Sequence, residues 1–170
     1  TTPMQRRTLI AAALAAPLPL RAQGTQAGAW PERPVRIIVP FPPGGSTDVV
    51  TRLIAEALGP RLGQAVVVEN RGGASGMIGA EAAARAAPDG HTLLMGSSGT
   101  QSINISLFPS VPYDPVRGFA PVILTAVYPL LMVTPTSRAP STVGEFIAHA
   151  RGSAGRLNYC SIGTGQPSHL

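Results

Sequence analysis

Lysine is absent from the 170-residue sequence, and all 13 basic residues are arginines. We interpret this as a compositional bias rather than a functional signal, but it excludes a Gly-Lys-Ser/Thr loop, in which lysine binds phosphates. The first strand-to-helix turn also lacks the GxGxxG pattern of dinucleotide sites. Gly73, Gly76 and Gly79 have a similar spacing, but on a later turn. These absences disfavour a nucleotide ligand.

The sequence also lacks a basic stripe. Its formal net charge is +5, but Arg6, Arg7 and Arg21 lie in a segment that we expect to be removed. The remainder contains ten arginines against eight acidic residues, and the arginines are scattered. A nucleic-acid surface needs clustered positive charge. We therefore expect no nucleic-acid partner.

Cysteine occurs once, so no internal disulfide can form. We expect Cys160 to be a small buried side chain in a strand over residues 157–162. Ser97 and Ser98 do not lie in a GxSxG turn, His91 and His149 have no convincing partner, and no cluster of metal ligands is present. We therefore expect neither an enzyme nor a cofactor or metal. An enzyme is the alternative.

The N-terminus has the layout of an export signal. Arg6 and Arg7 form a charged region, residues 9–20 an apolar region, and residues 20–22 a small-residue cleavage site. The paired arginines admit a twin-arginine signal and leave the export route open. The apolar region is too short to cross a membrane. We predict a signal peptide and short leader over residues 1–29, and an exported, soluble protein.

Strand and helix patterns alternate after this segment. We predict strands at residues 35–39, 65–68 and 91–95, and helices at residues 46–58 and 76–87. Such alternation is typical of right-handed crossovers in an open parallel sheet, which is an α/β fold. One face of the first helix is apolar and is expected to face the core, and it comprises Val49, Val50, Leu53, Ile54, Ala57 and Leu58.

The pattern changes from residue 97 onward, where prolines mark a crossing segment. We predict core strands at residues 122–125 and 130–133, and a helix at residues 142–150 that begins with Ser141 or Thr142 as its cap. These elements predict two α/β lobes, at residues 30–100 and 101–170, with a boundary near residues 99–116. The second lobe is expected to be incomplete, because residues 163–170 resemble a loop and the first turn of a helix.

Three loops rich in glycine and hydroxyl groups follow predicted strands. In open α/β sheets, ligands bind beyond the carboxyl ends of the strands, and helix N-termini offer free N–H groups and a partial positive charge. We therefore predict a site that holds an anion without a salt bridge. Its candidate residues are Gly44, Gly45, Ser46, Thr47 and Asp48 in the first loop, Ser97, Ser98, Gly99 and Thr100 in the second, and Ser161, Gly163 and Thr164 in the third.

Asp48 has two interpretations at this point. In the first turn of a helix it favours the helix dipole and pairs with Arg52 four residues on, which is a structural role. It would also repel an anion nearby, unless it points away or accepts a hydrogen bond from a hydroxyl or amine of the ligand. We favour the structural role.

Three long motifs lie at residues 30–58, 66–100 and 157–170. They read WPERPVRIIVPFPPGGSTDVVTRLIAEAL, VVVENRGGASGMIGAEAAARAAPDGHTLLMGSSGT and LNYCSIGTGQPSHL. Together they resemble the Bug family, which consists of periplasmic substrate-binding proteins linked to tripartite tricarboxylate transporters.

The resemblance implies a two-lobe fold like that of type II periplasmic binding proteins, closing on a small carboxylate. It places the ligand against the three loops and makes Phe41 a wall of the pocket. It further implies a monomer in the periplasm whose partners are the membrane subunits of such a transporter. The alternatives are a sensor module that presents the carboxylate to a membrane signalling partner, and an α/β enzyme acting on carboxylates.

Overall fold

The computed structural model describes residues 30–135, 137, 140–153 and 155–169. The chain divides into two compact units, Thr1–Trp30 and Pro31–Leu170, and all of the described residues except Trp30 belong to the second. The predicted signal peptide at residues 1–29 lies outside the described residues.

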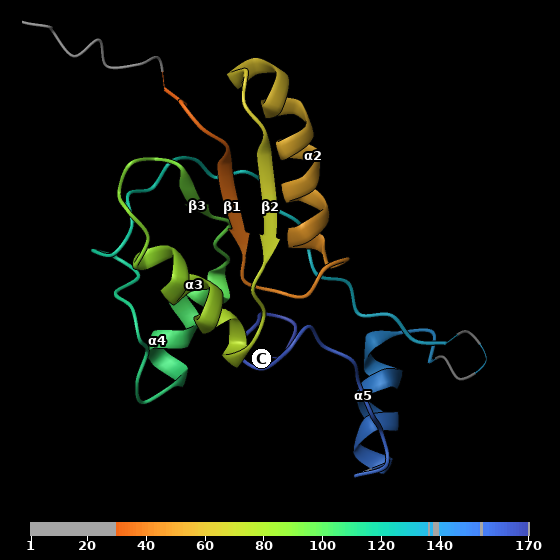
Figure 1. Cartoon of the computed structure of the whole chain (residues 1–170). Helices are drawn as coiled ribbons and strands as arrows, with labels where there is room; N and C mark the ends of the chain where they lie inside the picture. The colour runs from red at the N-terminus through yellow and green to blue at the C-terminus, as the bar shows by residue number, and fades with distance from the viewer. Residues whose placement is uncertain (1–29, 136, 138–139, 154, 170) are drawn as a thin grey trace, which may run out of the picture. The chain divides into compact units, whose positions relative to one another are not determined.

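A three-stranded parallel sheet forms the centre of the second unit (Figure 1). Its strands are β1 (Val35–Val39), β2 (Val66–Asn70) and β3 (Thr92–Leu94), in the order β2-β1-β3. In register, Val35 pairs with Val66 and Ile38 with Leu94. β1 is a run of branched apolar residues with neighbours on both sides, and four of its five residues are buried. The predicted α/β fold is confirmed, and β1 has the predicted bounds.

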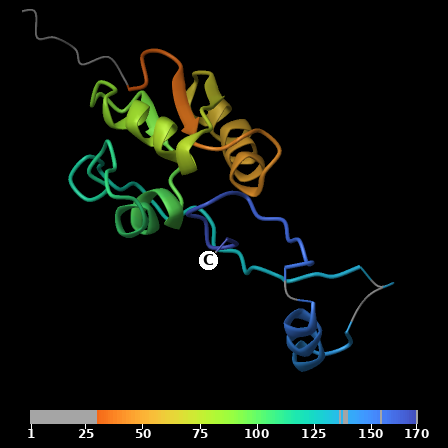
Figure 2. The same ribbon diagram turned by 90° about the horizontal axis from the view of Figure 1, so that it is seen from below.

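Two crossover helices cover opposite faces of the sheet, as Figure 2 shows from below. Helix α2 (Ser46–Leu62) connects β1 to β2, and α3 (Met77–Ala84), preceded by the 3₁₀ turn η2 (Ala74–Gly76), connects β2 to β3. Opposite faces follow from the strand order, because two right-handed crossovers in opposite directions along a sheet place their helices on different sides. Both helices were predicted, and α3 ends three residues early.

The buried face of α2 differs from the prediction. Asp48, Thr51 and Ala55 are buried, whereas Leu53, on the predicted core face, is 62% exposed. The apolar stripe therefore did not identify the side that packs against the sheet. Small side chains at positions 51 and 55 let the helix lie close to the strands, and hydrogen bonds satisfy the buried carboxylate of Asp48.

Helix α2 also continues four residues beyond its predicted end. The predicted end is Leu58, whereas the helix ends at Leu62 and is followed by Gly63, which has the left-handed φ of 65°. Proline has no backbone N–H, so it removes one hydrogen bond from a helix. In α2 this residue is Pro60, which lies in the last turn. The glycine with the left-handed backbone terminates the helix.

Residues 99–107 form a short helical segment after β3. It comprises η3 (Gly99–Ile103), a π-helical turn, and α4 (Asn104–Leu107). The hydroxyl of Tyr113 donates a 2.6 Å hydrogen bond to the carbonyl of Thr100. The Tyr113 ring also meets Phe119 edge to face, with centroids 5.9 Å apart. These contacts attach the segment after α4 to the helical turn.

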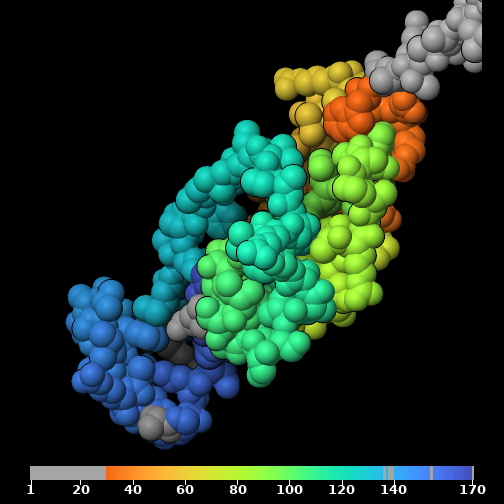
Figure 3. All heavy atoms as spheres, turned by 90° about the vertical axis from the view of Figure 1, so that its left-hand side faces the viewer, coloured from red at the N-terminus to blue at the C-terminus, as the bar shows by residue number. Residues whose placement is uncertain are grey.

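The predicted core strands at residues 122–125 and 130–133 are wrong. Residues 121–135 have no strand structure and are exposed, and Figure 3 shows this segment, coloured teal, with open space beside part of its length. Two polar contacts hold it, from Ser46 Oγ to Tyr128 Oη at 3.2 Å and from Thr125 Oγ1 to Met95 Sδ at 3.5 Å. A strand needs neighbouring backbone to pair with, and none of the described residues provides it.

The predicted strand at residues 157–162 is also wrong, for the same reason. Its backbone has no strand partner among the described residues, and Cys160 is exposed rather than buried. Apolar residues flanked by turn signals predict a strand only when a sheet is available to receive them.

The last helix, α5 (Val143–Gly152), was predicted with its cap. Thr142 Oγ1 accepts a 3.2 Å hydrogen bond from the N–H of Glu145, and the Glu145 carboxylate accepts one of 2.7 Å from the N–H of Ser141. These bonds satisfy N–H groups at the helix start. In the described part of the chain, no helix combines the length and apolar character needed to cross a bilayer.

Close packing of α3 against the end of β1 depends on Gly79. A Cβ at this position would lie 2.7 Å from the carbonyl oxygen of Arg71 and 2.8 Å from Cα of Pro40. Both are backbone atoms, so they cannot rotate away. We expect Gly79→Ala to lower the free energy of unfolding by about 1–3 kcal/mol, as overpacked sites do, in urea denaturation of the full-length protein.

Gly59→Ala is the matched control. Gly59 also lies in a helix, but a Cβ there would come no closer than 3.6 Å to any neighbour, the carbonyl oxygen of Gln64. This change should be neutral or stabilising by up to about 1 kcal/mol, because alanine favours a helix over glycine. Equal effects of the two substitutions would contradict the packing argument.

Candidate functional site

A pocket of about 310 Å³ lies beyond the carboxyl ends of β1 and β2. Three loops line it: the one after β1, the one after β2, and the loop over residues 161–166. The lining residues are Pro40, Phe41, Pro42, Gly73, Ser75, Gly76, Ile162, Gly163, Thr164 and Gln166. Of the predicted site residues, Phe41, Gly163 and Thr164 thus meet in one cavity.

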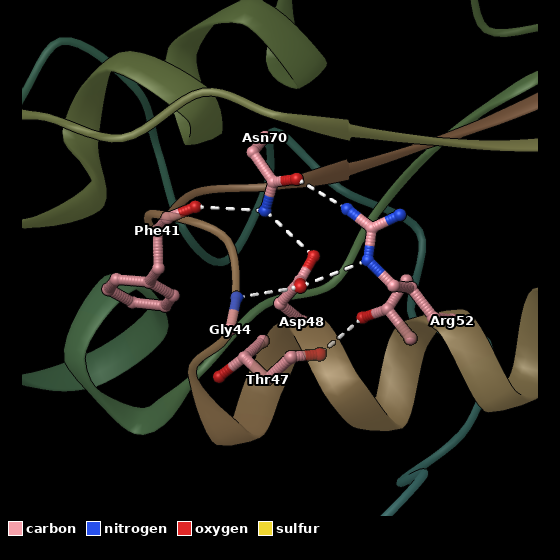
Figure 4. Close-up of polar contacts among 7 residues, drawn as sticks. Phe41, Gly44, Thr47, Asp48, Arg52 and Asn70 are labelled. Atoms are coloured by element: carbon pink, nitrogen blue, oxygen red, sulfur yellow. Dashed lines mark hydrogen bonds and ion pairs between the residues drawn. The ribbon is translucent and has the colours of Figure 1, made fainter.

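Phe41 forms a wall of the pocket, and Gly76 sits against its ring. Gly76 has a φ of 85°, which favours glycine, and a Cβ there would lie 3.3 Å from Phe41 Cε1 and 2.7 Å from Thr100 Cγ2. The carbonyl of Phe41 accepts a 3.1 Å hydrogen bond from Asn70 Nδ2 at the end of β2 (Figure 4). The loops after β1 and β2 are therefore fixed to each other beside the pocket.

The carboxylate of Asp48 holds the first loop in shape (Figure 4). Oδ2 accepts hydrogen bonds from the N–H of Gly44 at 2.8 Å and from Arg52 Nε at 3.0 Å, and Oδ1 accepts one from Asn70 Nδ2 at 2.9 Å. Arg52 Nη2 in turn donates to Asn70 Oδ1 at 2.9 Å. Asp48 is only 3% exposed, and these donors satisfy it. This geometry supports the structural interpretation, and a contact of Asp48 with a ligand stays a prediction.

The same hydrogen bonds shift the titration of Asp48. The bond from Arg52 contributes most, followed by those from Gly44 and Asn70, and together they lower the pKa of Asp48 to about 2. The carboxylate is therefore charged throughout the physiological range, and the loop keeps its anchor there.

The remaining residues of the first loop lie outside the pocket lining. Gly45 is the N-cap of α2 and provides no side-chain cap, Ser46 contacts Tyr128, and the carbonyl of Thr47 accepts a 2.6 Å hydrogen bond from Thr51 Oγ1. Gly44 to Ser46 are exposed. The start of α2 thus remains open to a ligand, but the pocket does not extend to it.

The second loop is closed on itself. The N–H of Ser97 donates to Thr100 Oγ1 at 3.0 Å, and the N–H of Thr100 donates to Ser97 Oγ at 3.3 Å. Gly99 and Thr100 are buried, whereas Ser98 is exposed. None of the four lines the pocket, but Ser97 Oγ lies 3.5 Å from Oε1 of Gln166, which does.

The third loop brings backbone groups to the pocket. Ser161 Oγ accepts a 3.3 Å hydrogen bond from the N–H of Gly163 and lies 3.2 Å from Nδ1 of His169, so it shapes the loop from outside the cavity. The carbonyl of Gly163 accepts from the N–H of Gln166 at 3.3 Å. Gly163 and Thr164 line the cavity itself.

No ionisable side chain lines the pocket within the part of the chain that the structure describes. Its polar groups are hydroxyl and amide side chains and the backbone of glycine-rich loops. Among the same residues, no group of histidine, cysteine, aspartate or glutamate could hold a metal ion. The pocket can accept an uncharged or anionic ligand through hydrogen bonds, and its apolar wall of Pro40, Phe41 and Ile162 can contact a carbon chain.

Sequence reasoning missed the loop after β2. Ser75, Gly76 and Gln166 all line the pocket, and Asn70 connects two of its loops. A signal for the first two exists, because the glycines at positions 73, 76 and 79 follow a strand, but their spacing by itself resembles a nucleotide motif. Nothing in the local sequence marks Gln166, since its position depends on tertiary packing.

The low pKa of Asp48 allows its role in anchoring the first loop to be tested by varying the pH. A carboxylate with a pKa below its ordinary value contributes stability above that value, and the contribution is lost as pH falls through the folded-state pKa. We expect Asp48→Asn to lower the free energy of unfolding at pH 7. The difference from the wild type should shrink as the pH falls from about 4 towards 2, as measured by urea denaturation across that range.

Glu56→Gln, on the exposed part of the same helix, is the control and should change stability by less than about 0.5 kcal/mol. The pKa values of Glu69, Asp89 and Asp114 are also lowered. Because these three residues are present in every variant, the difference in stability between wild type and Asp48→Asn reports on Asp48. A constant difference between wild type and Asp48→Asn at all pH values would contradict the assigned role.

Comparisons with known proteins give a consistent family. Residues 50–170 match the sequence profile described as "Tripartite tricarboxylate transporter family receptor". BugT of Bordetella pertussis is 41% identical over 150 residues, which are 88% of this chain and 46% of BugT. The chain spans about half the length of the curated relatives it matches.

Solved structures agree with this result. MatC from Rhodopseudomonas palustris, with bound malate, is 40% identical, and the match covers 73% of this chain and 42% of MatC with a TM-score of 0.69. The periplasmic binding protein BugD is 48% identical over 53% of this chain and 30% of BugD, with a TM-score of 0.50.

Proposed function

The chain belongs to the tripartite tricarboxylate transporter receptor family, and on that premise we propose that it binds a small carboxylate in the pocket beyond β1 and β2. The similarity to BugT and BugD confirms the predicted resemblance to Bug proteins and the predicted fold class. Its relatives are solute-binding proteins rather than enzymes.

The composition of the pocket lining carries the proposal. The cavity lies at the carboxyl ends of parallel strands, where ligands of open α/β sheets bind. Among the described residues, its lining presents glycine-rich backbone, hydroxyl and amide groups and no ionisable side chain. A hydrogen bond to a charged group contributes about 1.5–3 kcal/mol. Micromolar affinity requires about 8 kcal/mol, so four or five such bonds would be of the right order.

The size and the wall of the pocket limit the ligand. A volume of about 310 Å³ is at the small end of ligand sites. The aromatic and proline wall suits a short carbon chain between polar ends. Dicarboxylates are the first candidates, since MatC, which shares the fold, is seen with malate. Mono- and tricarboxylates remain within the proposal.

The biological setting follows from the family. We place the protein in the periplasm as a monomer that delivers its ligand to the membrane subunits of a tripartite transporter. Relatives described as periplasmic binding proteins support the location, and the family's description supports the transporter. Closure would occur by a hinge between the lobes at residues 30–100 and 101–170.

Titration calorimetry of the full-length protein against malate, succinate, adipate, citrate and acetate tests the ligand class. We expect at least one acid to bind with a micromolar or lower Kd, and the corresponding amide or methyl ester to bind at least tenfold more weakly. Absence of binding to every carboxylate, or turnover of a bound acid, would overturn the proposal.

Gly45→Val tests whether the start of α2 takes part. A Cβ at Gly45 would meet only the carbonyl oxygen of Pro42, at 3.9 Å, and the backbone is in the extended region, so valine fits the fold. We expect affinity for the cognate acid to fall at least tenfold, because the side chain blocks close approach to the helix N–H groups.

Gly152→Val is the control, since a Cβ there has no neighbour within 4 Å and the residue is the last of α5. It should leave affinity unchanged. If Gly45→Val also binds normally, the start of α2 is not part of the site, and the pocket alone remains as the candidate.

A further inference from the structure

A second cavity lies at the opposite end of the sheet from the proposed ligand pocket. Its volume is about 390 Å³, and it is bordered by the start of β1, by β2 and by the start of β3. Arg36, Val67 and Thr92 are neighbours in register on the three strands, so their side chains project from one face of the sheet. Val67 is 50% exposed, so this part of the face is open. We call this space the basic cavity.

The lining of the basic cavity carries two guanidinium groups, those of Arg33 and Arg36, and none of the described carboxylates. The carboxylates that pair with these arginines stand outside the lining. Asp89 Oδ2 lies 2.7 Å from Arg33 Nη2, and Glu69 Oε2 lies 3.2 Å from Arg36 Nη1. Glu69 is also the ion-pair partner of Arg71. Three arginines thus share two carboxylates, and the lining itself is positively charged.

Both guanidinium groups keep donors for a ligand. An arginine has five N–H donors. Arg33 donates from Nη2 to Asp89, and Arg36 uses Nη1 for Glu69 and Nη2 for Thr92 Oγ1, the latter at 3.3 Å. The side chains of Arg33 and Arg36 are 60% and 41% exposed, so a solute can reach them. The planar fork of a guanidinium group fits the two oxygens of one carboxylate.

The basic cavity also has an apolar side. Pro34 and Val67 line it together with the two arginines, and they can contact the carbon atoms of a ligand. Glu32, the sequence neighbour of Arg33, is not part of the lining, so among the described residues no carboxylate opposes an anion from within the cavity. A volume of about 390 Å³ is at the small end of ligand sites. The chemistry of this lining fits a small organic anion.

We propose that the basic cavity is a second ligand site, which binds a small organic dianion. One carboxylate of the ligand accepts hydrogen bonds from Arg36, Arg33 supplies further positive charge, and the carbon chain lies on Pro34 and Val67. The site differs in chemistry from the first pocket, whose described lining has no ionisable side chain. It does not depend on the proposed function, because it lies at the other end of the strands.

NMR spectroscopy of the full-length protein, titrated separately with succinate and with sulfate, tests the second site. Both probes are dianions at neutral pH. We expect the Nε–H signals of Arg33 and Arg36 and the amide signal of Val67 to shift, with a millimolar or lower Kd. Succinate should bind more tightly than sulfate, because only succinate has a carbon chain for the apolar side.

Salt separates the two sites further. Affinity at the basic cavity should fall severalfold between about 0.05 and 0.3 M sodium chloride, because salt screens exposed charges. Signals of Phe41 and Gly163 report on the first pocket in the same titration, so a failure of the proposed function and a failure of the second site are seen separately.

Arg36→Gln should weaken succinate binding at the basic cavity at least tenfold. Arg85→Gln is the matched control, because Arg85 is also an exposed arginine in an ion pair, with Glu81 at 2.6 Å, and it lies outside the lining. It should bind like the wild type, and both variants should have similar melting temperatures, since exposed ion pairs contribute little to stability.

Three results would overturn the second site as proposed. The first is the absence of shifts at Arg33 and Arg36 with either probe in the wild-type protein, which requires no variant to fold. The second is unchanged succinate affinity in Arg36→Gln. The third is sulfate binding at least as tight as that of succinate, which would exclude an organic ligand held on Pro34 and Val67.

Discussion

The carboxylate of Asp48 is the constraint on which the rest of the site depends. It binds the loop after β1 through Gly44, its own helix through Arg52, and the end of β2 through Asn70. Asn70 also holds the carbonyl of Phe41, so one buried charge fixes both the aromatic wall of the pocket and the start of α2. The prolines of the loop add stiffness, but the carboxylate connects the three elements.

The sequence predicted the elements whose own residues carry the signal. β1 forms as expected because its branched apolar run pairs with a strand on each side, and Thr142 caps α5 because capping involves only adjacent residues. The strands at residues 122–125, 130–133 and 157–162 were wrong, because strand formation requires a paired neighbour and apolar character does not supply one. The buried side of α2 was wrong as well, since close packing selected Thr51 and Ala55 over larger apolar residues.

The sequence predicted the kind of binding site but only some of the residues that line it. Phe41, Gly163 and Thr164 lie in one pocket. In the second loop, the hydroxyl groups of Ser97 and Thr100 each accept a hydrogen bond from the other residue's backbone N–H, and this loop contacts the pocket lining through Gln166. Glycines have two structural roles in this protein, and a sequence motif does not show which role a given glycine has. Gly44 and Gly76 adopt left-handed backbone, while Gly79 and Gly99 make room for another segment. Only the folded chain distinguishes them.

Residues 118–137 contain no charged side chain and many exposed branched apolar ones. Exposed runs of this composition are the segments through which chains associate into intermolecular sheets. Prolines at positions 121, 129 and 135 interrupt residues 118–137 at intervals of six to eight residues. Each proline lacks the backbone N–H that a neighbouring chain would need for strand pairing. The prolines thus act as gatekeepers against self-association of a segment that is free of charge.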